Sequence, residues 1–102
     1  MEVLINGVEL RNRVVWTRER KYVKRDGTEG VVKPRPYFTV DCKDKNGVMN
    51  SNMIYLSEDK VSILESKING FPDHAKLTLN CVLESSYDGQ FRVVCYDLDV
   101  KK

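Results

Sequence analysis

The fold is decided by residues 57–70, which read SEDKVSILESKING. Ser57 is a preferred N-cap residue, and the two acidic side chains after it suit the positive end of a helix. Val61, Leu64 and Ile68 follow at helical spacing and form one apolar stripe. An Asn-Gly pair ends the pattern, and a proline follows it closely. This stretch predicts one short amphipathic helix in a chain whose other segments have strand patterns.

The segment before the helix predicts two strands joined by a tight turn. Residues 37–42 alternate apolar and polar side chains, with Phe38 and Val40 on the apolar face. Asn46-Gly47 is a typical hairpin turn and leads into a second strand over residues 48–56.

The N-terminal third predicts a long strand followed by a hairpin. We expect a turn at Asn6-Gly7 to divide the strand, which then continues from residue 8 to about residue 23. Trp16 fits the apolar phase of this strand, so we expect it in the core. The hairpin turns around residues 25–30, and two nearby prolines place the returning segment at a sheet edge or a bulge.

Two further strands follow the helix. Residues 76–84 alternate apolar and polar positions, as expected for a half-buried strand. A loop at residues 85–89 leads into a last strand over residues 90–100. The apolar positions change phase midway along this strand, which predicts a bulge.

Three strands, one short helix and two strands are the element order of the OB-fold, a five-stranded Greek-key barrel. The predicted class is therefore all-β: an OB-like Greek-key barrel with a long basic β-hairpin and one short helix between strands three and four. An SH3-like barrel is the main alternative, but it would not naturally place a helix there. The length of 102 residues fits one domain, residues 1–102.

Composition points to a folded domain, with 41% hydrophobic and 31% charged residues. No apolar run approaches the roughly 20 residues that span a bilayer, and the N-terminus does not resemble a signal peptide. Cys42, Cys81 and Cys95 are widely spaced within apolar strand patterns, which favours reduced core residues over a zinc site or disulfides. We therefore expect a cytoplasmic protein with no membrane association, bound metal or cofactor.

Positive charge is concentrated in residues 11–35, which hold nine basic and three acidic residues. Such a segment is typical of proteins that bind polyanions, although a solvated hairpin face is the alternative. The side chains that we predict to contact phosphates are Arg18, Arg20, Lys21, Lys24, Arg25, Lys33 and Arg35.

Aromatic side chains occur among and after these basic residues. Proteins that bind single strands combine a positive groove with aromatic rings on which bases stack. Tyr37 lies on the strand face opposite Phe38, and Tyr87 lies in a loop, so both favour a binding role. Tyr55 and Phe91 fit either the core or the surface. The aromatic residues predicted for the nucleic-acid site are Tyr22, Tyr37, Tyr87 and Phe91.

Signals for catalysis are weak, and we predict no enzymatic activity and no catalytic residues. His74 lies in a loop without recognisable partners for a triad or a metal site. Asp97 and Asp99 share one strand face, where a pair of carboxylates can bind a metal, but a solvent-facing strand explains them more simply. Two alternatives remain: a protein-interaction module of a larger assembly, and a metal-dependent hydrolase or nuclease.

Two short motifs, Arg35-Pro36-Tyr37 and residues 85–91 (SSYDGQF), resemble the filamentous-phage gene V type of single-strand DNA-binding protein. That family is a dimeric OB-like barrel that coats phage or replicating DNA. The resemblance implies DNA contacts at Tyr37 and Phe91, and phosphate contacts by basic residues of the hairpin. It also implies a homodimer that binds single strands largely without sequence specificity.

For biology, the resemblance implies protection of single-stranded DNA during phage replication or recombination, in the cytoplasm of a bacterial host. Replication or recombination proteins are then candidate partners. The residues do not distinguish DNA from RNA, since both offer phosphates and stackable bases.

Overall fold

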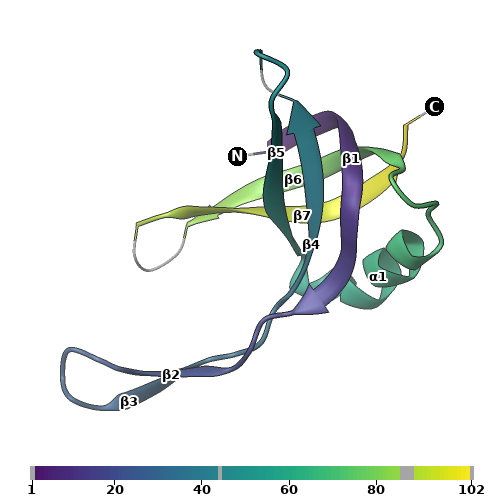
Figure 1. Ribbon diagram of the computed structural model, residues 1–102. Helices are drawn as coiled ribbons and strands as arrows, with labels where there is room; N and C mark the ends of the chain where they lie inside the picture. Colours follow the sequence, from purple (N-terminus) through teal and green to yellow (C-terminus); the bar gives the residue numbers. More distant parts are fainter. Residues whose placement is uncertain (1, 44, 86–88, 102) are drawn as a thin grey trace.

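The computed structural model describes residues 2–43, 45–85 and 89–101, in which five strands close into a barrel (Figure 1). The barrel strands are β1 (Glu2–Trp16), β4 (Pro36–Lys43), β5 (Met49–Leu56), β6 (Lys76–Ser85) and β7 (Phe91–Val100). Their order around the barrel is β1-β4-β5-β7-β6. The ladder between β5 and β7 is parallel, and the other ladders of the barrel are antiparallel. The predicted all-β barrel is confirmed.

The core follows the alternation seen in the sequence. Phe38 and Val40 of β4 are buried, while the residues between them are only partly buried. Leu77, Leu79 and Cys81 of β6 repeat the pattern and are fully buried. Because successive side chains of a strand point to opposite faces, each of these strands presents an apolar face to the barrel interior and a second face outward.

One short α-helix packs against the barrel. α1 (Val61–Asn69) lies between β5 and β6 in the chain, directly after the 3₁₀ turn η1 (Glu58–Lys60). Leu64 and Ile68 of α1 are buried within the core, so the predicted apolar stripe is confirmed. The α-helix begins later than predicted, because residues 58–60 form the 3₁₀ turn, and the Ser57 hydroxyl donates to the Asp59 carboxylate and not to a backbone N–H. No helix in the described part of the chain is long and apolar enough to cross a membrane.

The basic hairpin stands apart from the barrel. β2 (Arg20–Val23) and β3 (Glu29–Val32) form a separate two-stranded sheet that extends well beyond the barrel (Figure 1). Its turn is closed by a bond of 2.8 Å from the Lys24 N–H to the Thr28 carbonyl. The Asp26 carboxylate accepts the Thr28 hydroxyl and N–H, which lowers the pKa of Asp26. The turn therefore has a defined, hydrogen-bonded conformation.

Three predictions about β1 are wrong. Asn6-Gly7 is not a turn: β1 runs through it, with a register shift opposite β6 and a Gly7 φ of 77°. This is a bulge, which glycine accommodates because it tolerates positive φ. Two further register shifts opposite β4 lie between Leu10 and Val15, and together they return the alternation to its original phase, with Trp16 opposite Pro36. Trp16, predicted in the core, is nevertheless 53% exposed: it is the last residue of β1, where the chain leaves the barrel for the hairpin. The strand also ends there, well short of residue 23.

The predicted bulge in the last strand is confirmed. Asn80 pairs with Asp97 and Cys81 pairs with Cys95, which leaves Tyr96 as the extra residue of β7. Cys81 and Cys95 are fully buried and free, and Cys42 is partly buried and also free. The cysteines of β6 and β7 thus serve as small apolar core residues, as the sequence predicted.

Candidate nucleic-acid interface

The outer face of β4 and β5 carries four cross-strand rows of side chains, of which Lys43 with Met49 is farthest from the hairpin. The other three rows pair Tyr37 with Tyr55, Thr39 with Met53, and Asp41 with Ser51. Their sequence neighbours Phe38, Val40 and Ile54 are buried in the barrel, so strand alternation directs these six side chains outward.

The row nearest the hairpin is aromatic and surrounded by arginine. The rings of Tyr37 and Tyr55 have centroids 6.1 Å apart and planes tilted by 54°. The guanidinium groups of Arg35 and Arg92 lie 5.1 and 5.4 Å from the centre of the Tyr55 ring, within the range of a cation–π interaction. Tyr55 therefore contacts two arginine side chains, and the partly buried ring of Tyr37 lies next to Tyr55.

Arg35 is fixed at the point where the hairpin joins the barrel. The Thr17 N–H donates to the Arg35 carbonyl, and the Arg35 N–H donates to the Thr17 hydroxyl. The side chain is only 14% exposed, and its Nη1 lies 3.3 Å from the Glu84 carboxylate. Its Nε lies 4.0 Å from the Glu58 carboxylate. Arg35, predicted as a phosphate ligand, is thus held in place by internal ion pairs.

A cavity of about 150 Å³ opens beside this arginine, at the root of the hairpin. Four of the seven basic residues predicted from the sequence line it, namely Arg18, Arg20, Lys33 and Arg35. Arg92 and Tyr55 complete its polar and aromatic lining. Arg92 was missed because it lies far from the basic segment in sequence, although its position directly after Phe91 was a signal.

The remaining basic residues of the hairpin lie outside this cavity. Lys21 occupies the ribbon face opposite Arg20, while Lys24 and Arg25 lie at the turn. Tyr22 shares the face of Arg20, and its ring lies over Gly30, where an added Cβ would clash with it. The sequence-predicted cations therefore divide into a group at the root and a group at the tip.

Phe91 is the first residue of β7 and is 72% exposed. It pairs with Ser85 and directly precedes Arg92, so it lies on the surface and not in the core. An exposed phenylalanine beside an arginine is a suitable platform for a base. Tyr87, the other aromatic predicted in this loop, lies outside the described residues.

Two buried polar atoms near Tyr37 have no hydrogen-bond partner within the described chain: Arg35 Nε and Thr39 Oγ1. They belong to the residues two positions before and two positions after Tyr37. Buried polar groups in proteins are nearly always hydrogen-bonded, so such an atom calls for an explanation. A polar ligand that lies along this face would supply one.

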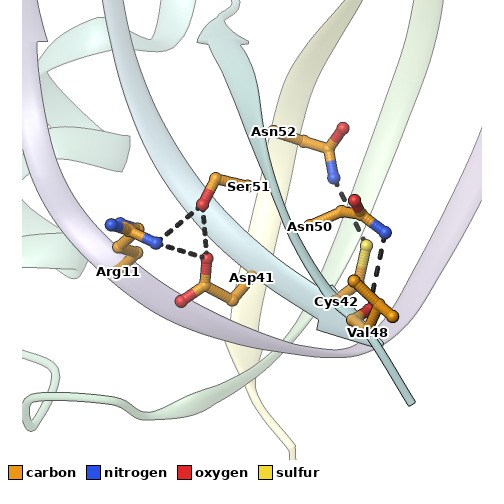
Figure 2. Close-up of polar contacts among 7 residues, drawn as sticks. All are labelled: Arg11, Asp41, Cys42, Val48, Asn50, Ser51 and Asn52. Atoms are coloured by element: carbon orange, nitrogen blue, oxygen red, sulfur yellow. Dashed lines mark hydrogen bonds and ion pairs between the residues drawn. The ribbon is translucent and has the colours of Figure 1, made fainter. Parts of the chain in front are cut away.

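The far end of the same face is internally neutralised (Figure 2). Arg11 Nη1 donates to the Ser51 hydroxyl at 2.8 Å and to the Asp41 carboxylate at 3.3 Å, and Ser51 donates to Asp41 at 2.8 Å. The hydrogen bond from Ser51 and the charge of Arg11 lower the pKa of Asp41. Arg11 is therefore compensated, and the free positive charge lies toward the hairpin.

The two aspartates considered for metal binding contact a lysine. The Lys67 ammonium lies 3.2 Å from Asp97 and 3.6 Å from Asp99, and the hydrogen bond to Asp97 raises the pKa of Lys67. Within the described residues, no group of three or more histidine, cysteine or acidic side chains is placed to hold a metal ion. His74 is exposed in its loop.

Comparison with known proteins adds no assignment: no protein-family model matches the chain, and no curated protein matches it.

Proposed function

We propose that this chain is a non-enzymatic, OB-type protein that binds single-stranded DNA largely without sequence specificity. In OB-folds, oligonucleotides bind the face of strands two and three, flanked by the loops between strands one and two and between strands four and five. Counting barrel strands only, these are β4 and β5, the β2–β3 hairpin, and the connection from β6 to β7. The barrel order and the position of α1 support the OB assignment.

One observation carries the proposal: the aromatic row and the cation-lined cavity adjoin each other on this face. Tyr55 belongs to both, because it pairs with Tyr37 and also lines the cavity with Arg92. A positive groove beside exposed rings is the combination that single-strand binders use, since phosphates and bases are both accessible in an unpaired strand.

The proposed mode of binding follows from these side chains. Bases stack on Tyr37 and Phe91, which contributes roughly 1–3 kcal/mol per base and tolerates any base. The cations of the hairpin neutralise phosphates and release counterions, which gives affinity without reading sequence. Protection of single strands during phage replication or recombination, in a bacterial cytoplasm, is the biological role that fits this mode.

We also propose that the protein acts as a homodimer, with replication or recombination proteins as partners. Met49–Ile54 of β5 pair with β4 on one side, and within the described chain the β5–β7 ladder involves Tyr55 and Leu56 alone. A strand edge of this kind can pair with the same edge of a second copy. Sedimentation equilibrium would give the mass of two chains for a dimer and of one chain for a monomer.

The test of the proposed function is fluorescence polarisation with labelled dT, U and duplex DNA oligonucleotides of equal length at low salt. We expect stronger binding to dT than to the duplex, and the comparison of dT with U ranks DNA against RNA. Equal or stronger binding to the duplex would contradict a single-strand site, because stacking requires unpaired bases.

A second candidate, a protein-interaction module, is favoured by the other face of the hairpin. Val23 and Val31 lie on that face and are 73% and 48% exposed. Exposed apolar side chains on a projecting ribbon can dock a protein partner. A bound host protein that survives nuclease treatment and is lost in Val23→Ser would favour this candidate.

A further inference from the structure

The cavity at the hairpin root is lined by a concentration of positive charge. Five of its lining side chains are cations, from three places in the sequence: Arg18 and Arg20 before β3, Lys33 and Arg35 after it, and Arg92 in β7. Among the described residues that line the cavity, none is acidic. Glu84 and Glu58 pair with Arg35 from outside the lining, and an anion bound among the five cations would reduce their remaining mutual repulsion.

The chemistry of the lining identifies the anion as a phosphate group. Arginine forks match the oxygens of phosphate in bidentate geometry, and lysine adds a point charge. The cavity of about 150 Å³ is open to solvent, so a phosphate group can enter it. Arg35 Nε, which is buried and has no hydrogen-bond partner in the described chain, belongs to a residue of this lining and offers a further donor.

We propose that this cavity is a phosphate pocket that holds the backbone of a bound strand at one fixed point, with Arg92 as a direct ligand. The proposal rests on the proposed function and adds to it a defined subsite and a residue outside the basic hairpin. Tyr55 is a positioning residue of this pocket. Its ring carries the guanidinium groups of Arg35 and Arg92, while Glu84 holds Arg35 through an ion pair at 3.3 Å.

The position of Arg92 is set by the barrel and not by the hairpin. Tyr55 pairs with Val94 across the parallel β5–β7 ladder, and Arg92 precedes Val94 by two residues on the same strand. The pocket therefore joins the cations of the projecting hairpin to a cation on the barrel. A bound nucleic-acid strand that runs from the β4–β5 face to the hairpin would pass over this cavity.

The first test compares Arg92→Gln with Lys76→Gln, which removes the same charge from an exposed site that lines a different cavity. Binding of a dT oligonucleotide is measured over a range of salt concentrations. We expect Arg92→Gln to weaken binding on the order of tenfold and to reduce the slope of log K against log salt by about 0.7, the value for one phosphate contact. Equal slopes for the two variants would overturn the assignment of Arg92.

The second test locates the phosphate on the strand. A dT oligonucleotide just long enough to fill the site is made with one neutral methylphosphonate linkage, moved along its length. We expect one linkage to cost more affinity than the others in the wild type, and this peak to vanish in Arg92→Gln. A uniform cost at all linkages would overturn the fixed point.

The third test separates this pocket from the proposed function, because it uses no nucleic acid. Tripolyphosphate is titrated into the protein by calorimetry at low salt. We expect saturable binding to the wild type and to Lys76→Gln, and binding weakened several-fold in Arg92→Gln. Absence of binding, or the same binding to all three proteins, would overturn the pocket. A protein that binds tripolyphosphate but no single strand would retain the pocket and lose the proposed function.

The role of Tyr55 has its own readout. Tyr55→Phe keeps the ring over which the guanidiniums lie, whereas Tyr55→Leu removes it. We expect Tyr55→Phe to restore most of the tripolyphosphate affinity that Tyr55→Leu loses, at similar melting temperatures. If both variants bind alike, the ring does not position Arg35 and Arg92.

Discussion

Tyr37 and Tyr55 face each other across the β4–β5 ladder, with ring centroids 6.1 Å apart, yet their surroundings differ. Tyr55 has two guanidinium groups within 5.4 Å of its ring centre. A ring engaged by cations is a support for those cations, while a neighbouring ring is better suited to stack on a base. The same row of the sheet can thus serve phosphate binding at one residue and base binding at the other.

Replacement of Tyr37 by alanine is therefore predicted to weaken single-strand binding by about tenfold, within the roughly 1–3 kcal/mol that one stacked base contributes. Tyr37→Phe, which keeps the ring, should retain more affinity than Tyr37→Ala. Both are measured by polarisation, with circular dichroism to verify the fold. Unfolding of Tyr37→Ala would show instead that Tyr37 is structural.

The neighbouring Phe38 should behave in the opposite way. It is fully buried in the barrel core, and removal of a buried phenylalanine side chain typically costs about 3–5 kcal/mol. Urea unfolding of Phe38→Leu and Phe38→Ala should show a graded loss of stability. Stability close to that of the wild type in Phe38→Ala would contradict the burial of this side chain.

The basic residues at the hairpin tip should contribute to the binding of single strands but not to the stability of the barrel. For the double variant Lys24→Gln/Arg25→Gln, we expect the salt slope to fall by up to about 1.4, because each lost phosphate contact removes about 0.7. The melting temperature should not change, since both residues lie in the turn between β2 and β3, which form their own sheet. Lys45→Gln, an exposed change in the β4–β5 connection, is the control. An unchanged slope in the double variant would exclude the tip from the interface.

The effect of replacing Gly30 should depend on the Tyr22 ring that lies over it. A Cβ at this position would collide with the Tyr22 ring, so Gly30→Ala should displace Tyr22 and lower single-strand affinity several-fold. In a Tyr22→Ala background the same change should have little further effect, as a double-mutant cycle would measure. Additive losses would show that Gly30 acts independently of Tyr22.

Acid should destabilise the protein through paired carboxylates. Ser51 and Arg11 lower the pKa of Asp41, and Arg13 lowers the pKa of Asp73, in the folded state. A lowered folded-state pKa stabilises the fold above the unfolded value of about 3.9, and this contribution is lost as the pH falls below it. Urea unfolding between pH 6 and pH 2.5 should show this loss, and Asp41→Asn should show less of it. The same pH profile in both proteins would contradict a role for Asp41.

Local patterns predicted the local parts of this structure. The alternation around Phe38 and the helical spacing of Leu64 and Ile68 identified core residues, because burial repeats with the period of each element. Trp16 was misplaced although it keeps the apolar phase of its strand, because it is the last residue of β1 and alternation does not show where the barrel ends. The bulge in β7 could be predicted because the apolar positions before and after Tyr96 follow different phases of the alternation.

The site was predicted only as far as its residues are neighbours in sequence. The basic hairpin and Tyr37 were visible as one charged segment followed by an aromatic. Arg92 joins them through the parallel pairing of Tyr55 with Val94, a contact between distant segments that no periodicity encodes. The cavity therefore forms only when the barrel closes. Its hairpin residues could be predicted from the sequence, but Arg92 on the barrel could not.

The most direct measurement is the affinity for a labelled dT oligonucleotide as the salt concentration is raised, followed by polarisation and by Trp16 fluorescence. Trp16 is the single tryptophan and lies exposed at the root of the hairpin. Log K should fall linearly with log salt, with a slope near −3 if about four phosphates are neutralised at about 0.7 each. An affinity that does not change with salt, or no binding at low salt, would contradict a single-strand site built from the hairpin and the β4–β5 face.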